Sequence, residues 1–294
     1  MVTKMKVELL SSTQNSEKVA AAAGKWCYRK VGVEKIIEKI SDEEVERFLV
    51  MLNNMGHHSP LEHVSFTFGV EGVSRSLTHQ LVRHRIGSYS QQSQRYVKID
   101  QFEYVVPPQI RNNKAAKNIY IKQMESAQKA YNDICYKLLM DKAEEYGVYD
   151  LYCEYALDKL RKAHKTNVIS NERIEASSLK HYEDIVDLET YWMSIDKKTC
   201  SRIMKTIIED ARYVFPNACE TKIVFTFNLR SLINFIRHRS CSRAQWEIRE
   251  LANEIIKIME KDYPVISKFL GAPCQFGKCP EGAMTCGKPL ERRK

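Results

Sequence analysis

Residues 83–96 read Arg83-His84-Arg85-Ile86-Gly87-Ser88-Tyr89-Ser90-Gln91-Gln92-Ser93-Gln94-Arg95-Tyr96 and contain three arginines, a histidine, three serines and three glutamines. A guanidinium group offers a planar fork of N–H donors that matches phosphate oxygens and the polar edge of a nucleobase. A second arginine-rich run lies far downstream and reads Arg237-His238-Arg239-Ser240-Cys241-Ser242-Arg243. Together the two runs predict a site for phosphorylated, anionic small molecules.

Regular patterns lead into the first run. Apolar residues alternate over 64–70, which predicts a half-buried strand, and Val73, Leu77 and Leu81 have the spacing of a helix that extends to Arg83. The arginines therefore follow a helix and run into a loop at Gly87. Further upstream we expect a strand at 6–10, a helix at 15–25, and a helix that begins with a capping box at residues 41–44 and ends at Gly56.

Downstream of the first run the chain is mostly helical. We expect a short strand at 104–106, one long helix at 113–146, and further helices over 150–212 with a loop at 168–178. A strand at 223–227 then leads into a helix at 229–236, and an apolar stripe predicts a last long helix that ends near Tyr263. These elements predict an α/β (α+β) fold with a central, mainly antiparallel sheet and long helices.

The second arginine run lies next to a predicted helix start. Residues 242–245 resemble a capping box with Ser242 as the N-cap, which places Arg239 three residues before a helix. Exposed basic residues near a helix N-terminus cost about 0.3–1 kcal/mol each, so three arginines there need a reason. A bound anion would offset this cost. Arg83 and Arg85 need no such explanation, because they follow a helix C-terminus and complement its dipole.

The composition limits the class of protein. The net charge is +9, from 46 basic and 37 acidic residues, which leaves a basic RNA-binding protein as the rival hypothesis. No run reaches eighteen consecutive apolar residues, and the first residues lack the apolar core of a signal peptide. Nine scattered cysteines fit reduced thiols in a cytosol. We therefore expect a cytoplasmic protein that binds neither membrane nor nucleic acid.

Three segments resemble a known family. The pattern Arg83-His84-Arg85-x-x-Ser88-x-x-x-x-Ser93-x-Arg95 is similar to the signature of the flavin-dependent thymidylate synthases. Two further segments of that family resemble residues 56–63 and residues 228–248, the latter reading Asn228-Leu229-Arg230-Ser231-Leu232-x-Asn234-Phe235, then Arg239 and Ala244-Gln245-Trp246-Glu247-Ile248. The matches occur in order and cover about residues 5–110 and 210–265.

The resemblance implies an activity, an assembly and a set of site residues. It implies the thymidylate synthase-complementing-type fold in a homotetramer with sites at subunit interfaces, and reductive methylation of dUMP to dTMP with FAD, methylenetetrahydrofolate and NADPH. By position, FAD would be held by Ser59, Arg83, His84, Arg85, Gln91, Asn228, Leu229, Arg230 and Asn234. The substrate dUMP would be held by Gln80, Arg83, Gln91, Gln92, Ser93, Gln94, Arg95, Arg212 and Arg239. Arg239 would activate the uracil ring, reduced FAD would supply the hydride, and no metal is implied.

The chain departs from the family pattern at three positions. Gln91 stands where many members carry Glu, Ser90 replaces an Asn, and His58 stands where a Glu is common. We expect residues 1–270 to form the catalytic domain, with a helical insertion at about 111–210, and residues 271–294 to form a basic tail rich in Cys, Gly and Pro.

Several cysteines suggest other chemistry. Cys241 lies between arginines near a predicted helix start, where a thiol nucleophile could be activated, but the family works without a cysteine nucleophile. Cys274, Cys279 and Cys286 could bind zinc with a fourth ligand, although their spacing lacks paired C-x-x-C motifs. His57, His58 and His63 are better explained by a flavin contact and by packing than by a metal site.

Overall fold

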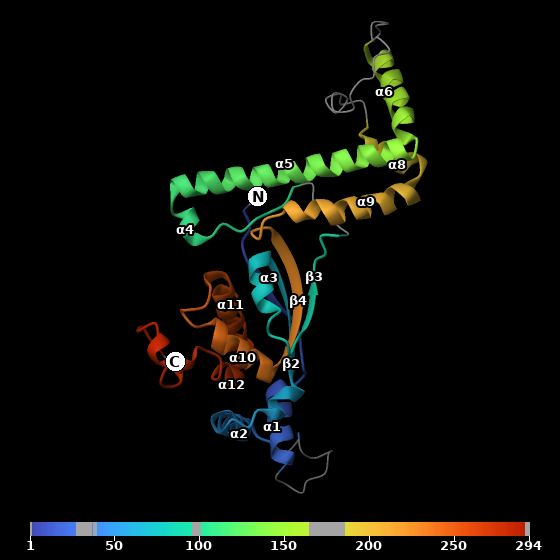
Figure 1. The fold of residues 1–294 in the computed structure, drawn as a ribbon. Helices are drawn as coiled ribbons and strands as arrows, with labels where there is room; N and C mark the ends of the chain where they lie inside the picture. Colours follow the sequence, from blue (N-terminus) through green and yellow to red (C-terminus); the bar gives the residue numbers. More distant parts are fainter. Residues whose placement is uncertain (1, 28–36, 38–39, 96–100, 165–185, 292–294) are drawn as a thin grey trace. The chain divides into compact units, whose positions relative to one another are not determined.

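The computed structural model describes residues 2–27, 37, 40–95, 101–164 and 186–291 (Figure 1). The chain divides into two compact units. Unit 1 comprises Met1–Gln92, Glu103–Val106 and Asn217–Lys294, and unit 2 comprises Ser93–Phe102 and Pro107–Pro216. The residues with expected site roles are therefore distributed over both units.

Unit 1 is built on a four-stranded antiparallel sheet. The strands lie in the order β1 (Lys6–Ser12), β2 (Ser65–Ser74), β4 (Glu220–Asn228) and β3 (Ser88–Gln91). On the two central strands, Phe66 lies opposite Phe227 and Phe68 lies opposite Phe225, and all four side chains are buried. The alternation over 64–70 thus marks the buried face of the sheet, as the sequence predicted.

Helices cover that buried face. In Figure 1, α3 (Arg75–Leu81), α10 (Leu229–Arg239) and α11 (Trp246–Asp262) lie on one side of the strands. Their apolar faces join the phenylalanines of the sheet in one core. The remaining elements of unit 1 are α1 (Ser16–Trp26), α2 (Asp42–Met55), η2 (Ser59–His63), α12 (Pro264–Ser267), η4 (Pro273–Gln275) and η5 (Gly282–Met284).

Unit 2 is helical and has its own core. It contains α4 (Pro108–Arg111), α5 (Lys114–Glu145), α6 (Val148–His164), α8 (Leu188–Ile195), α9 (Lys197–Ala211) and η3 (Arg212–Val214). In its core Trp192 is buried, and the rings of Tyr131 and Phe215 stack with their centroids 4.4 Å apart. The long predicted helix is α5, whose N-cap Asn113 accepts a hydrogen bond from the Ala116 amide.

Most predicted elements are confirmed. Ser41 caps α2, and Gly56 ends it with a φ of 73°, a left-handed conformation that glycine adopts without strain. The fold class, an antiparallel sheet with long helices, is also confirmed. The predicted loop at 168–178 lies outside the described residues. Among the described helices, none is long and apolar enough to cross a membrane.

Three predicted elements differ from the structure. The strand predicted at 104–106 is reduced to isolated bridges of Tyr104 with Val2 and Cys219. The helix predicted from Val73 begins at Arg75, because Val73 pairs with Thr221 in the sheet and Ser74 caps the helix. The helix predicted from the Ser242 capping box begins at Trp246 instead, because the Gln245 side chain accepts hydrogen bonds from the amides of Glu247 (3.0 Å) and Ile248 (3.1 Å). A glutamine side chain thus takes the place that Ser242 was expected to fill.

Candidate functional site

The corrected start of α11 changes the setting of the second arginine run. Arg237 and Arg239 lie in the last turn of α10, not before a helix N-terminus. There they complement the negative end of the helix dipole, as Arg83 and Arg85 do just after α3. The helix dipole therefore does not predict a bound anion at Arg239. Only the charges around Arg239 could attract one.

The structure brings the two arginine runs together in unit 1. Arg239 Nε donates a hydrogen bond to His84 Nε2 over 3.0 Å. Gly87 allows the loop between α3 and β3 to lie against β4, because a Cβ at this position would collide with the ring of Phe227 and come within 3.2 Å of the Thr226 carbonyl oxygen. Residues 155 positions apart thus share one surface.

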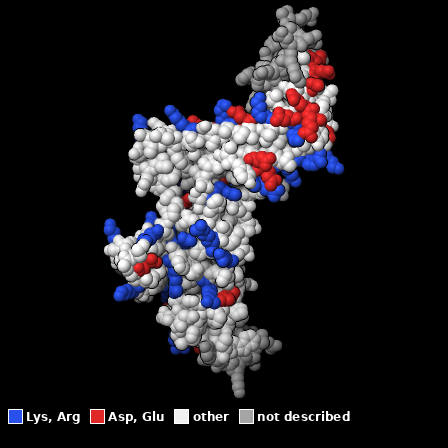
Figure 2. All heavy atoms as spheres, viewed as in Figure 1, with Lys and Arg blue, Asp and Glu red and all other residues white. Residues whose placement is uncertain are grey.

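Three arginines on this surface carry uncompensated charge. Within the described part of the chain, Arg83, Arg85 and Arg239 have no carboxylate partner. Burial and the nearby Arg83 lower the pKa of Arg239. Figure 2 shows Lys and Arg side chains gathered over α3 and α10, with few acidic side chains among them. Like charges held close together without counter-charges favour binding of an anion.

A cavity of about 400 Å³ lies beside the start of α10. It is lined by Gly24, Cys27, Leu52, Gly56, His57, His58, Ser59, Pro60 and Arg230. Arg230 forms an ion pair with Glu62, and Ser59 is exposed. Two of the expected FAD ligands, Ser59 and Arg230, therefore share one cavity.

The chemistry of this cavity fits a flavin nucleotide. His58 Nε2 is buried and has no hydrogen-bond partner among the described residues. Burial, and then the charge of Arg237, lowers the pKa of His58, so its ring is neutral near pH 7. A buried polar atom without a partner is costly, so an added ligand that hydrogen-bonds to it would be favoured. The cavity thus offers a guanidinium, a hydroxyl and an unsatisfied ring nitrogen to a polar, anionic molecule.

Other expected site residues of unit 1 have structural partners. Asn228 caps α10 by accepting the Ser231 amide hydrogen at 2.8 Å, and Leu229 is fully buried. The Gln91 amide nitrogen donates to the hydroxyl oxygens of Thr78 (3.0 Å) and Thr221 (3.2 Å). Asn234 is exposed on α10, and Gln80 is half-buried at the end of α3.

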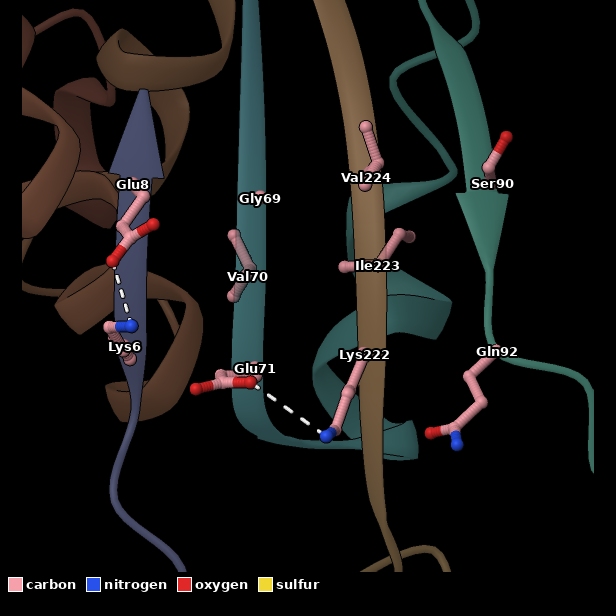
Figure 3. Close-up of a pocket in the computed structure, with 10 residues that line it drawn as sticks. All are labelled: Lys6, Glu8, Gly69, Val70, Glu71, Ser90, Gln92, Lys222, Ile223 and Val224. Atoms are coloured by element: carbon pink, nitrogen blue, oxygen red, sulfur yellow. Dashed lines mark ion pairs between the residues drawn. The ribbon is translucent and has the colours of Figure 1, made fainter. Parts of the chain in front are cut away.

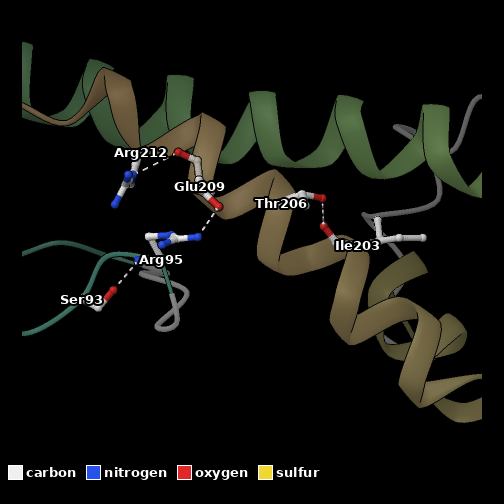
Figure 4. Close-up of polar contacts among 6 residues, drawn as sticks. All are labelled: Ser93, Arg95, Ile203, Thr206, Glu209 and Arg212. Atoms are coloured by element: carbon white, nitrogen blue, oxygen red, sulfur yellow. Dashed lines mark hydrogen bonds and ion pairs between the residues drawn. The ribbon is translucent and has the colours of Figure 1, made fainter.

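Four of the expected dUMP ligands belong to unit 2: Ser93, Gln94, Arg95 and Arg212. Figure 4 shows that Glu209 of α9 lies between the two arginines. Its carboxylate pairs with Arg95 Nη2 at 2.9 Å, while its backbone carbonyl accepts a hydrogen bond from Arg212 Nε at 3.1 Å. The Ser93 hydroxyl accepts the Arg95 amide hydrogen. Unit 2 thus gathers two guanidinium groups around one residue that the sequence analysis did not identify.

A second concave region lies on the face of the sheet opposite to α10 (Figure 3). It measures about 350 Å³ and is lined by charged residues in two ion pairs, Lys6 with Glu8 and Lys222 with Glu71. Of the expected site residues it includes Gln92. The internally paired charges make this region a weaker anion site than the surface at Arg83 and Arg239.

The described cysteines form neither disulfides nor a metal-binding group. Where the chain is described, all nine are free thiols, and no three His, Cys, Asp or Glu side chains are placed to hold a metal ion. Cys286 instead accepts a hydrogen bond from the Ser242 hydroxyl, and Cys274 accepts one from the Leu290 amide. The zinc hypothesis for the tail has no geometric support among these residues.

Comparison with known proteins connects this geometry to a family. Residues 8–265 match the family model described as thymidylate synthase complementing protein. A flavin-dependent thymidylate synthase from Clostridium tetani is 49% identical over 290 residues, which cover 99% of this chain and 96% of that protein. The chain belongs to the flavin-dependent thymidylate synthases. Proteins of the same name from Geobacter sulfurreducens and Nitratidesulfovibrio vulgaris are 38% and 37% identical, each over 99% of this chain and at least 97% of their own length.

Membership of the flavin-dependent thymidylate synthases makes this chain an enzyme and confirms the resemblance drawn from the three sequence segments. It also favours an enzyme over the RNA-binding rival. Sequence reasoning assigned His84 to the cofactor alone and missed its contact with Arg239. No sequence pattern indicated that pairing, and none distinguished Glu209 from other acidic residues on a helix.

Proposed function

We propose that this chain catalyses the reductive methylation of dUMP to dTMP, with FAD as cofactor, methylenetetrahydrofolate as carbon donor and NADPH as reductant. The names of the relatives support flavin dependence and a thymidylate product. The observation that carries the proposal is the surface where Arg239, held by His84, lies near Arg83 without a carboxylate partner in the described chain. The free thiols are consistent with action in the reducing cytoplasm.

Arg239 is the proposed catalytic residue. Its terminal N–H groups would donate to a ring carbonyl and nitrogen of the uracil, where they stabilise negative charge and raise electron density at the carbon to be methylated. Because Arg239 is part-buried, its charge is less screened by water than that of an exposed arginine. This activation needs no thiolate, and we propose that Cys241 has no role as a nucleophile.

The remaining side chains would bind and orient the ligands. Ser59, Arg230 and His58 would hold the flavin nucleotide in the 400 Å³ cavity. The bound flavin would supply the hydride, which no side chain of the protein can provide. Ser93, Arg95 and Arg212 would bind the phosphate of dUMP from unit 2.

The function is tested with purified protein. It should show a flavin spectrum that bleaches under anaerobic conditions with NADPH, and it should release tritium from dUMP labelled at the carbon to be methylated. A protein that takes up FAD but releases no tritium would be a flavoprotein without methyl transfer. A protein that takes up no FAD but binds RNA with a steep salt dependence would support the RNA-binding rival instead.

We also propose that the enzyme is a homotetramer with sites shared between subunits. Light scattering should then give the mass of four chains. Two inactive variants, Arg239→Ala in unit 1 and Arg95→Ala in unit 2, should regain part of the activity when mixed tetramers are formed, because some sites would again contain both arginines. A monomeric mass, or no recovery in verified mixed tetramers, would contradict shared sites.

A further inference from the structure

Several residues of unit 1 contact His84, which is half-buried. Its ring packs edge-on against Phe235, with ring centroids 5.1 Å apart, and against Phe227 at 6.4 Å. Its backbone carbonyl accepts a hydrogen bond from the Tyr89 hydroxyl, whose single proton is shared with the Leu81 carbonyl. Burial raises the pKa of Tyr89 to about 12, so this hydroxyl stays a donor throughout the working pH range. These contacts favour the orientation in which the ring of His84 faces Arg239.

The contact with Arg239 defines the tautomer of His84. A guanidinium can only donate, so His84 Nε2 must carry a lone pair and the proton of the neutral ring must lie on Nδ1. Burial, the charge of Arg239 and the neighbouring His238 lower the pKa of His84 to about 4. The ring is therefore neutral above pH 5, and the hydrogen bond to Arg239 persists there.

The hydrogen bond occupies only one of the donor nitrogens of Arg239. Its Nη1 and Nη2 have no partner among the described residues. Holding a flexible arginine through Nε removes rotamer freedom that would otherwise be lost when the ligand binds. The planar geometry of the group then sets the direction of the two terminal nitrogens.

We propose that His84 is a positioning residue: its neutral ring accepts Arg239 Nε–H and so presents the two terminal nitrogens of Arg239 to the substrate. The inference rests on the proposed role of Arg239 in activating the uracil. His84 Nδ1–H stays available for the cofactor, so positioning of Arg239 is compatible with the cofactor contact that the family resemblance implies. Misplacement of a reacting group by about 1 Å can lower a rate on the order of 100-fold.

The test compares three variants of the full-length, FAD-loaded enzyme. His84→Phe keeps a ring but cannot accept the hydrogen bond, His84→Gln can accept it through its side-chain oxygen, and His79→Gln is the control on the exposed face of α3. We expect kcat to fall about 10- to 100-fold in His84→Phe, with a smaller rise in KM for dUMP. His84→Gln should recover most of the loss, and His79→Gln should behave as wild type.

Two readouts separate positioning from other roles. Because His84→Phe also removes the Nδ1–H that the cofactor would contact, kcat is measured per bound FAD, and a normal kcat per bound FAD in His84→Phe would overturn the proposal. Solid-state ¹⁵N spectra of histidine-labelled protein, assigned with the His84→Gln variant, should show an unprotonated Nε2 and a protonated Nδ1. A protonated Nε2, or unchanged kinetics in His84→Phe, would also overturn it. The spectra remain informative even if wild-type enzyme makes no dTMP, so failure of the proposed function is recognised separately.

Discussion

The Glu247 carboxylate accepts two hydrogen bonds from Ser74, one from its backbone amide at 2.7 Å and one from its hydroxyl at 2.5 Å. The two residues lie 173 positions apart, and Glu247 is only 2% exposed. Ser74 also caps α3 by accepting the Leu77 amide hydrogen at 3.1 Å. Glu247 thus joins the first turn of α11 to the helix that leads into Arg83.

Removing this carboxylate should destabilise unit 1. Glu247→Ala leaves the buried Ser74 amide without an acceptor, and we expect the free energy of unfolding to fall by about 1–3 kcal/mol in urea titrations. Glu250→Ala, on the exposed side of the same helix, is the matched control and should change it by less than about 0.5 kcal/mol. Equal stabilities of the two variants would show that the contact contributes nothing.

The cap of α10 can be separated from any ligand contact of Asn228. Asn228→Ala removes the acceptor for the Ser231 amide and should lower the free energy of unfolding by about 1 kcal/mol, whereas Asn228→Asp keeps an acceptor and should not. Urea unfolding without added FAD measures the cap alone. If the alanine variant unfolds like wild type, the cap is not a stabilising contact.

Replacing Arg239 tests the proposed chemistry. Arg239→Ala should lower kcat for dTMP formation by at least about 100-fold, because donors placed at developing charge are worth factors of this order. FAD content and reduction of the flavin by NADPH should persist. Arg239→Lys should recover little, since an ammonium lacks the fork that can hold His84 and a ligand together. Near-normal dTMP formation by Arg239→Ala would contradict its assignment.

The lowered pKa of His84 predicts a pH dependence of stability. The unfolded chain binds a proton at His84 near its ordinary pKa of 6.5, but the folded chain does so only near 4. Stability should therefore fall as pH decreases from about 6.5 to 4. The charged and titratable neighbours are Arg239 and His238 on α10 and Tyr89 on β3.

Comparison with a variant isolates this contribution. His84→Phe lacks the titrating ring, so wild type should lose more stability than the variant between pH 7 and pH 5. Urea midpoints at the two pH values measure the difference. Parallel losses in the two proteins would mean that His84 titrates normally in the folded state.

The sequence predicted those parts of the fold that depend on local patterns. Alternating apolar residues located β2, and the spacing around Tyr131 located α5. The predicted start of α11 was wrong. Ser242 and Gln245 both have side chains that can cap a helix, and the local sequence does not decide between them. The predicted helix at α3 began too early, because Val73 fits either a helix or a strand. Its pairing with Thr221 on β4 places it in the strand.

For the site, the sequence by itself determined which groups are present: two runs of arginines whose charge and planar donors favour an anionic ligand, and enough family signature to identify the enzyme. It could not determine their partners, because hydrogen bonds form between atoms brought close by folding and leave no local pattern in the chain. Only the tertiary structure brought His84 into contact with Arg239, and Glu209 into contact with Arg95 and Arg212. It also left the Nη groups of Arg239 without a partner among the described residues. Burial then lowered the pKa of His84, because water withdrawn from the ring no longer stabilises its charged form.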